Sequence, residues 1–476
     1  MTNYTRFSSR ASLAVIGALM RQRRFWKPVE QHVHIRQKVI KHRPTDKLLD
    51  AFINVVAGGH GVVEINTRVR PDQALQRAFG RTSCAEQSVV SDTLNACTEE
   101  NVTQMRCALQ DIYRARSRGC RHDYGSSWQV LDVDMTGMPM NGHGQGVTKG
   151  YFAGQKNRRG RQLGRVAATL YDEIVVERLY PGTVQLERSL QSLVVAAEAT
   201  LRLSEAQRQQ TIVRVDGGGG RDTDINWLLQ RGYAVLVKVK NWKRAAKLAR
   251  SVTTWTIDPK TGDRQVGWVE TPHPYACATR QLAVRTPKKN GDWHSWIIAC
   301  SLSDEQVFWL ARRPLPENLT REQVMFAALY AYDLRSGGVE TTIKGSKQGL
   351  GLTKRNKHSF FAQEMLVLLA QLAYNLIIWV RAKLGRTTPP LHRFDPLRMV
   401  RDLFHIPGKI QLDHQERIIE ITLHAAHPLA PPFLQAISSL LAGDEMVLNL
   451  GRIQVSGLDA PHPRPATVSS APFVVQ

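Results

Sequence analysis

The alternation of apolar and acidic positions predicts two strands that carry carboxylates. In the stretch 130–136, apolar residues alternate with Asp132 and Asp134, and a strand places both carboxylates on one face. A second apolar run begins at Thr211 and ends on Asp216, where consecutive glycines follow. A solvated surface strand shows the same acidic alternation, so the first stretch alone leaves that interpretation open. Two apolar strands that each deliver an aspartate favour a divalent metal ion held between adjacent strands.

The pattern between residues 126 and 250 predicts an α/β arrangement of strands and crossover helices. After the first strand come a glycine-rich, basic hairpin and then, in order, strands 166–171 and 173–179, helix 186–203, strand 211–216, helix 223–230 and strand 233–240. The first three strands are expected to form an antiparallel meander. The two later strands, each preceded by a helix, are expected to join the same sheet through crossover connections. This is the element order of an RNase H-like fold.

Helical periodicity dominates the first part of the chain, residues 1–125. The first 30 residues are basic and predict a mobile leader. Asp72 is placed to cap a helix that ends near Gly80, and a second helix follows after a short turn. The second helix is rich in Gln, Ser and Thr, which predicts a DNA-binding helix-turn-helix over about residues 72–95, although ordinary helical hairpins share this pattern.

Residues 251–325 change the pattern to short, aromatic, alternating segments separated by turns. This pattern predicts a β-rich insertion in the catalytic domain, whose last part is then expected at residues 326–385. Four tryptophans of the insertion could stack on an unpaired base, although such tryptophans more often form the core of a sheet. They are Trp255, Trp268, Trp293 and Trp296.

The apolar run from Met365 to Val380 follows helical spacing but is shorter than a membrane span. It also contains Gln371 and Asn375, so we expect a buried core helix and no membrane partner. Residues 386–476 form a C-terminal region without an assignable pattern, and we expect its proline-rich tail to be disordered.

The charge balance indicates a polyanionic partner. The chain of 476 residues has 64 Lys and Arg against 41 Asp and Glu, a formal net charge of +23, which favours nucleic acid or an anionic membrane surface. The apolar run 11–20 is short and is followed by arginines, so no signal peptide is expected. The six cysteines form no C-x-x-C pair, which indicates neither a zinc site nor a disulfide framework and favours a reducing cytosol.

A spaced set of polar residues further along the chain brings a family resemblance. Tyr332, Arg335, Glu340 and Lys347 follow one another with gaps of two, four and six residues. The chain resembles the bacterial insertion-sequence DDE transposases that carry a Tyr, Arg, Glu, Lys signature, in which the usual gaps are two, three and six. The segment 373–376 also resembles a piece of such enzymes.

Two upstream segments extend this resemblance. Residues 132–136 look like the first aspartate box of the family, and residues 213–217 look like the second. The resemblance implies that Asp134, Asp216 and Glu340 are the catalytic carboxylates and the metal ligands.

Rival carboxylates stand beside two of these positions. Asp132 shares a strand face with Asp134, which we prefer because the family places a threonine two residues after its aspartate and Thr136 fits. Asp222 and Asp224 follow the second box, and Asp224 is placed as a helix-start residue.

The oxygen ligands expected here suit Mg²⁺ or Mn²⁺, and we expect two ions. A pair of divalent ions can activate the attacking water and stabilise the leaving oxygen when a phosphodiester is cleaved in line.

Basic residues around the glutamate are expected to contact DNA phosphates. The resemblance implies such contacts for Tyr332, Arg335 and Lys347. A basic run beyond residue 343 adds Lys344, Lys354 and Arg355.

The unusual gap before Glu340 predicts a local break in the helix. Gly337 and Gly338 are poor residues for a helix interior but are suited to a bulge. We therefore expect a bulge at these glycines, with Arg335 before it and Glu340 beyond it.

The resemblance implies a DNA transposase that binds insertion-sequence ends, cleaves phosphodiester bonds and joins the 3′ hydroxyl to target DNA. Its expected partners are end DNA, target DNA and a second copy of the chain in a synaptic complex, in the bacterial cytoplasm at the nucleoid. Two alternatives stay open: a transposase-derived DNA-binding protein that no longer cuts, and a metal-dependent nuclease without strand transfer.

Overall fold

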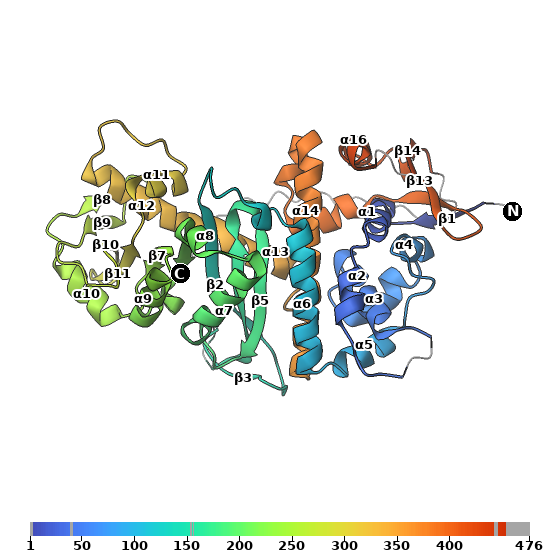
Figure 1. Ribbon diagram of the computed structural model, residues 1–476, viewed down its shortest axis with the longest axis horizontal. Coiled ribbons are helices and arrows are strands. Elements are labelled where there is room, and N and C mark those ends of the chain that lie inside the picture. The colour runs from blue at the N-terminus through green and yellow to red at the C-terminus, as the bar shows by residue number, and fades with distance from the viewer. Residues whose placement is uncertain (1–2, 39–40, 153–154, 156, 442–445, 454–476) are drawn as a thin grey trace.

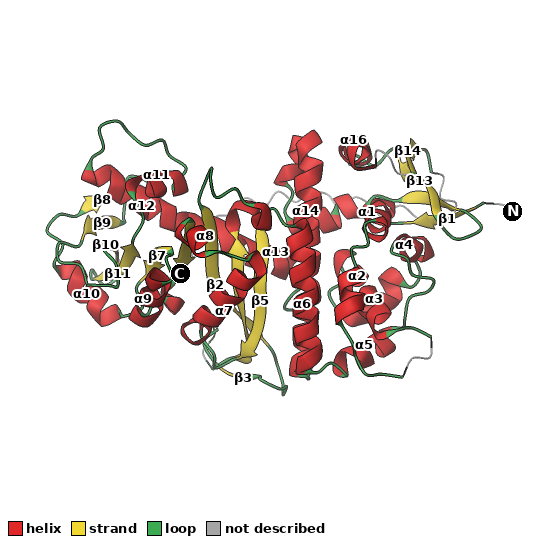
Figure 2. Cartoon of the chain, in the orientation of Figure 1, coloured by secondary structure: helices red, strands yellow, loops and turns green. Residues whose placement is uncertain are grey.

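The elements are arranged along the longest axis of an elongated molecule (Figure 1). The computed structural model describes residues 3–38, 41–152, 155, 157–441 and 446–453. A long mixed sheet with its helices occupies one end and the middle. Beside this sheet stand two long helices, α14 (Phe360–Thr387) and α6 (Glu99–Arg116), and further helices with a small second sheet form the other end (Figure 2).

The main sheet, as far as the structure describes the chain, has ten strands in the order β3-β4-β2-β6-β7-β11-β10-β9-β8, with β5 paired to β4. These strands are β2 (Gln129–Pro139), β3 (Thr148–Lys149), β4 (Arg159–Ala168), β5 (Glu173–Pro181), β6 (Thr211–Val215), β7 (Ala234–Lys238), β8 (Thr256–Ile257), β9 (Gln265–Trp268), β10 (Arg280–Pro287) and β11 (Trp293–Cys300). Strands β2, β4 and β5 form an antiparallel meander, and β6 and β7 add to β2 in parallel. The element order predicted for residues 126–250 is confirmed.

Crossover helices cover the strands of this core. Helix α7 (Leu186–Leu201) connects β5 to β6 together with the short α8 (Glu205–Gln209), and α9 (Asp222–Gln230) connects β6 to β7. The apolar face of α7 packs on β4 and β5, because its inward positions are leucine, valine and alanine at helical spacing. The buried residues include Leu190, Leu193, Val194 and Ala197.

The β-rich insertion continues the main sheet. Strand β11 pairs antiparallel with β7, and β10, β9 and β8 follow outward. Helices α10 (Trp242–Arg250) and α11 (Asp304–Leu310) flank these strands. An ion pair fixes the insertion to the next helix, since Arg264, the residue before β9, donates to Asp333 at 3.1 and 2.7 Å.

Helix α14 lies between the sheet and the N-terminal helices. Among the described residues it alone is long and apolar enough to cross a membrane, and its apolar window is fully buried inside the protein. The core helix predicted for Met365–Val380 is therefore confirmed. The side-chain amide of Asn375 donates to the carbonyl of Ile174 at 2.8 Å and accepts from its N–H at 2.9 Å, so this polar residue fixes the helix to β5.

The N-terminal part combines helices with strands from both ends of the described chain. Strand β1 (Tyr4–Ser8) pairs with β12 (Gly408–Leu412), which continues to β13 (Ile418–His424) and β14 (Val447–Gly451). The helices are α1 (Ala11–Gln22), α2 (Lys27–His32), α3 (Pro44–Val56), α4 (Gln73–Ala78), α5 (Gln87–Asn95), α15 (Pro396–Arg401) and α16 (Ala430–Leu441).

The mobile leader predicted for the first 30 residues is wrong for its described part. Helix α1 buries most of its side chains in the core, and β1 finds its partner strand near residue 410. The C-terminal region therefore contributes the strands β12, β13 and β14 to the N-terminal part. The tail predicted to be disordered lies outside the described residues.

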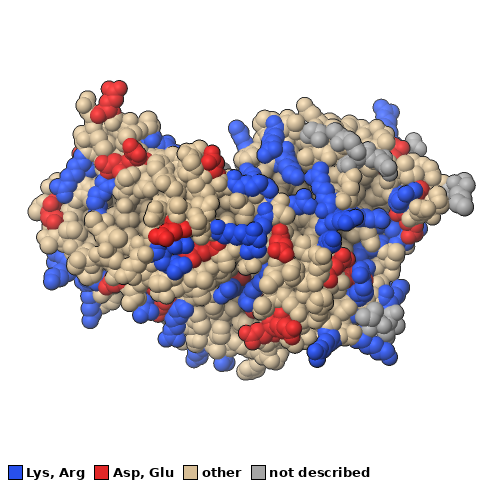
Figure 3. All heavy atoms as spheres, in the orientation of Figure 1, with Lys and Arg blue, Asp and Glu red and all other residues tan. Residues whose placement is uncertain are grey.

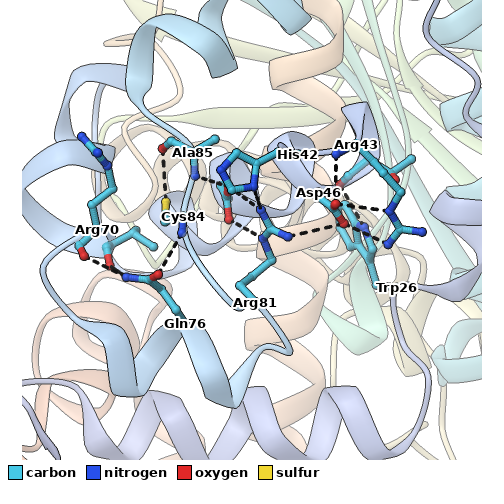
Figure 4. Close-up of polar contacts among 12 residues, drawn as sticks. Trp26, His42, Arg43, Asp46, Arg70, Gln76, Arg81, Cys84 and Ala85 are labelled. Carbon is cyan, nitrogen blue, oxygen red and sulfur yellow. Dashed lines mark hydrogen bonds and ion pairs between the residues drawn. The ribbon is translucent and has the colours of Figure 1, made fainter. Parts of the chain in front are cut away.

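The segment predicted to read DNA contains α4 and α5. Asp72 caps α4 by accepting a hydrogen bond from the N–H of Leu75 at 2.9 Å, as predicted. A buried ion pair fixes the loop between the helices to α3, because Arg81 donates to both oxygens of Asp50 at 2.8 and 3.1 Å (Figure 4). The N–H of Ala85 donates to the same carboxylate at 2.8 Å. The loop is rigidly supported, and DNA contact by α5 stays a prediction.

Candidate active site

Two aspartates lie side by side on adjacent parallel strands. Strands β2 and β6 pair in register up to Val133 and Val215, so the next residues, Asp134 and Asp216, are neighbours. The side chain of Asp134 is 16% exposed and that of Asp216 is 45% exposed. Burial raises the pKa of Asp134 above its ordinary value, although the nearby Arg335 acts in the opposite direction.

The guanidinium of Arg335 joins the three carboxylates singled out from the sequence. Its Nη2 lies 2.8 Å from Glu340 Oε1 and 3.9 Å from Asp216 Oδ2. Its Nη1 lies 3.2 Å from Asp134 Oδ2. Burial opposes the charge of Arg335, but Asp134, Tyr332, Asp216 and Glu340 outweigh it and raise the pKa. The structure thus gathers the three carboxylates around one positive charge.

Glu340 ends a π-helical turn that absorbs the extra residue of the signature. Helix α12 (Arg321–Arg335) passes through π-helical residues 336–340 into α13 (Thr341–Gly349). Gly338 leaves helical geometry, with φ −94° and ψ −106°. The bulge predicted at the two glycines is confirmed. A π-helical turn stacks residues five apart, which brings Glu340 over Arg335.

A buried ion pair between the two central strands supports the helix that leads into this bulge. Arg214 on β6 donates to both oxygens of Asp132 at 2.6 and 2.8 Å and to the carbonyl of Ala331 on α12 at 2.9 Å. Asp132 is fully buried, so its carboxylate serves this pair and is not available at the site. This arrangement favours Asp134 over Asp132 as the catalytic residue.

A second buried ion pair holds α13, the helix that begins after Glu340. Arg165 on β4 and Glu177 on β5 are partners in cross-strand register, and their side chains form the pair. Arg165 also donates to Thr342 Oγ1 and to Ser346 Oγ on α13, each at 2.9 Å. Burial raises the pKa of Glu177, although Arg165 opposes this. The pair positions Glu340 through the helix.

Tyr332 contacts the carboxylate of Asp216, and Lys347 contacts Thr136 on β2, the strand that carries Asp134. The hydroxyl of Tyr332 donates to Asp216 Oδ1 at 3.3 Å, and Nζ of Lys347 donates to Thr136 Oγ1 at 2.6 Å. Burial and the charge of Asp216 raise the pKa of Tyr332, which keeps the phenol protonated. Burial lowers the pKa of Lys347. The whole signature therefore lines one site, and phosphate contacts by these residues stay a prediction.

The additional basic residues divide into exposed and buried ones. Lys344 and Lys354 are exposed, so both can meet a polyanion. Arg355 is 4% exposed and donates to the carbonyls of Gly59 and Leu350. Burial lowers its pKa to about 10. The structure corrects the DNA-contact prediction for Arg355, because its guanidinium is occupied inside the protein.

The rival carboxylates after the second box have other partners. Asp222 forms an ion pair with Arg244, with Nη1 2.6 Å from Oδ2. Asp224 lies in the first turn of α9 as predicted, is buried and accepts from Gln191 at 3.1 Å. These contacts turn both side chains toward other elements and leave Asp216 as the aspartate beside Asp134.

The tryptophans of the insertion are engaged in packing. Trp255 and Trp293 both contact the guanidinium of Arg285, whose Cζ is 4.0 and 4.3 Å from their ring centroids. Trp268 donates its indole N–H to the carbonyl of Arg321 at 3.1 Å. Trp296 packs against the same hydrophobic cluster as Trp268. Stacking on an unpaired base stays a prediction.

The sequence interpretation missed Arg214 and Glu177. Arg214 is the single charge of the apolar strand β6, which is a detectable signal because a buried charge requires a partner. Glu177 shares β5 with Glu173 and Arg178, so the sequence marks it less clearly. The partners lie on neighbouring strands, so only the strand register identifies them.

The donor set fits a hard divalent cation by its chemistry. Carboxylate oxygens are the ligands that Mg²⁺ prefers, and the three carboxylates already stabilise a positive charge between them. Within the described ranges no group of three or more His, Cys, Asp or Glu side chains has the geometry of a formed metal site. The guanidinium of Arg335 takes the charge-balancing position instead.

Asp134 on β2, Asp216 directly after β6 and Glu340 at the end of the π-helical turn form one acidic site. Residues 3–443 match the model of transposase DDE domain group 1, and the chain belongs to this DDE transposase family. Among solved structures, it is similar to the piggyBac transposase in a synaptic complex with hairpin DNA, studied by cryo-EM. The identity is 10% and the TM-score 0.43, over 85% of this chain and 82% of that chain. No curated protein matches the sequence.

Proposed function

We propose that the protein is a metal-dependent DNA transposase of the bacterial insertion-sequence type. The observation that carries this proposal is the convergence of Asp134, Asp216 and Glu340 on Arg335 in a chain of the DDE transposase family. Strands β2, β4, β5, β6 and β7 with their crossover helices would be an RNase H-like core, and the π-helical bulge would place the glutamate opposite the two aspartates.

The chemistry follows from what each side chain can do. Asp134, Asp216 and Glu340 would hold divalent Mg²⁺ or Mn²⁺, which when bound supplies the activation of water and the stabilisation of the leaving oxygen. Arg335 would turn from the carboxylates to a phosphate oxygen, for which a guanidinium has a matching fork of donors. Lys347 would add a second positive charge beside the same strand.

The proposed partners follow from this activity. We expect the protein to bind transposon-end and target DNA and to act as a homodimer in a synaptic complex. We expect it to work in the bacterial cytoplasm at the nucleoid, without a membrane partner.

A labelled transposon-end duplex tests the proposal. With Mg²⁺ or Mn²⁺, the protein should first nick the end and then join its 3′ hydroxyl to an unlabelled plasmid. Nicking without joining would indicate a nuclease, and DNA binding without nicking would indicate a binding protein derived from a transposase. Neither result would agree with the proposal.

Arg335 should compete with a metal ion when DNA is absent. Arg335→Gln removes a positive charge within 2.8 to 3.9 Å of three carboxylates, so the variant should bind Mn²⁺ about tenfold or more tightly than the wild type. Electron paramagnetic resonance of free Mn²⁺ measures this affinity directly, without any activity assay.

Arg264→Gln is the matched control for this measurement. Arg264 is also paired with two aspartates, Asp258 and Asp333, but these do not belong to the triad. The control should bind Mn²⁺ like the wild type. Equal affinity of the Arg335 variant and the wild type would contradict the competing role of Arg335.

A further inference from the structure

The C-terminal ends of three helices meet at a basic surface away from the three carboxylates. Helices α1, α6 and α14 all end there, and α16 lies beside them. Five cationic side chains surround the meeting point, which we call the helix-end patch: Arg23, Arg116, Arg121, Lys383 and Arg386. In the space-filling view, Lys and Arg side chains gather around a notch in the middle of this face, over the region where α6 and α14 end (Figure 3).

The arginines of the helix-end patch donate to main-chain carbonyls. Arg23 donates to the carbonyl of Leu440 at 3.2 Å, and Arg116 donates to the carbonyl of Arg23 at 2.9 Å. Arg121 donates to the carbonyls of Ala115 at 3.2 Å and Arg116 at 2.7 Å. In the part of the chain that the structure describes, none of the five patch residues forms an ion pair with a carboxylate. The positive charge is therefore not neutralised within the described protein.

These charges act on one another. Burial lowers the pKa of Lys383, and Arg23, Arg116, Arg121 and Arg386 lower it further. The four guanidinium groups therefore lie near enough to Lys383 to disfavour its charge. Like charges held together raise the free energy of the unbound protein, and an anion that binds between them relieves this repulsion.

Helix ends explain only part of this arrangement. The dipole of a helix stabilises a cation near its C-terminus, so an arginine at one helix end needs no further explanation. Four of these cations, Arg23, Arg116, Arg121 and Lys383, line one cavity of about 210 Å³. The charge of Arg386, one turn further along α14, acts on Lys383. The walls of the cavity are apolar and include Ile16, Leu19, Met20, Leu376, Trp379 and Val380.

The surface favours a nucleic acid backbone over a membrane. None of the described cavity-wall side chains is among the large apolar residues that protrude from the protein, so the patch offers nothing to insert into a lipid layer. Four of the five cations are exposed, and a chain of phosphates can contact several of them together. Residues 122–128 connect Arg121 to β2, the strand that carries Asp134, and α14 packs on β5 of the same sheet.

We propose that the helix-end patch binds the phosphate backbone of duplex DNA outside the reacting segment. This inference rests on the proposed function, because it assigns to the patch the DNA that continues beyond the cleaved phosphodiester. The contact is independent of base sequence, since arginine and lysine reach phosphate oxygens and not base edges.

The test compares two triple variants with equal loss of charge. Arg121→Gln/Lys383→Gln/Arg386→Gln removes patch charges, and Lys247→Gln/Arg250→Gln/Lys409→Gln removes exposed charges elsewhere. The dissociation constant of a labelled random-sequence duplex is measured against salt concentration. The patch variant should show a slope of log K against log salt reduced by about 2 to 3, because each lost phosphate contact removes about 0.9. The control should keep the wild-type slope.

A second variant distinguishes the loss of phosphate contacts from a folding defect. Lys383→Gln/Arg386→Gln leaves the three carbonyl-bound arginines in place and should reduce the slope by about 1 to 2. Thermal unfolding of this double variant should not fall below that of the wild type, because its two substitutions relieve repulsion among the patch charges.

The possible outcomes separate this inference from the proposed function. Equal slopes for patch and control variants would overturn the inference while leaving cleavage of end DNA intact. Patch variants that lose binding to phosphatidylserine vesicles but not to DNA would also overturn it, in favour of a membrane surface. If the wild-type protein bound no duplex even at low salt, this result would contradict both the proposed function and the inference.

Discussion

Replacement of Glu340 by glutamine should abolish metal-dependent cleavage of end DNA while DNA binding persists. The change keeps the shape of the side chain and removes the charge that would bind metal in the proposed mechanism. The loss of cleavage should therefore exceed the roughly 10- to 100-fold loss that follows when a hydrogen-bond partner of a metal ligand is replaced. Asp134→Asn should have the same effect. DNA affinity should be kept or increased in both variants, because a negative charge that faces phosphate is lost. Cleavage on a sequencing gel and binding by gel shift measure the two effects separately.

Asp132→Asn provides the contrast within the same strand. It breaks the buried pair with Arg214, so it should lower the free energy of unfolding by about 3–5 kcal/mol, which a thermal or denaturant melt detects. If Glu340→Gln or Asp134→Asn nicked DNA at the wild-type rate, this result would contradict a catalytic role for the substituted residue. An inactive but fully stable Asp132→Asn protein would transfer the catalytic role to Asp132.

Substitution of Gly338 by alanine should displace Glu340 and destabilise the protein. A Cβ atom at this position would lie 2.5 Å from Asp132 Oδ2 and 2.9 Å from Thr169 Cγ2, so the bulge must move away from the buried ion pair. Overpacking of this kind costs about 1–3 kcal/mol. A shift of the helix by about 1 Å would reduce cleavage about 100-fold, because the reacting groups lose their alignment. Melting temperature and the cleavage rate in Mg²⁺ measure the two effects.

Gly337→Ala is the matched control for this prediction. No atom outside its chain neighbours lies within 4 Å of a Cβ atom built at Gly337, and the residue is exposed. Alanine is better than glycine in helical segments by about 1 kcal/mol, so this variant should be as stable as the wild type or slightly more stable. Similar loss of stability and cleavage in both alanine variants would show that the bulge depends on glycine flexibility and not on the close approach at Gly338.

The sequence predicts the central strands and two carboxylates well because local patterns determine them. Apolar runs that end on an acidic residue specify β2 and β6, and parallel pairing then brings Asp134 beside Asp216. The bulge at Gly338 is also predictable, since the altered gap coincides with paired glycines. These features depend on residues close together in the chain.

Features that depend on distant partners escape prediction. The sequence before residue 30 looks like a basic leader because the partner of β1 lies in β12, which no local pattern reveals. Arg355 looks like a surface cation because the carbonyl of Gly59, which it contacts, comes from the N-terminal part. The orientation of Arg335 toward the carboxylates likewise depends on three other elements.

The pairing of β1 with β12 makes the order of synthesis important for this protein. Beside this pairing, Ser12 donates to the carbonyl of Leu403, a contact between residues 391 positions apart. A ribosome that adds about 5–20 residues per second needs on the order of tens of seconds to cover that distance. During this time the edge of β1 that pairs with β12 stays unpaired, because β12 has not yet left the ribosome. A prematurely terminated product without β12 would keep that edge exposed and would be a target for proteases or aggregation before it could compete for DNA.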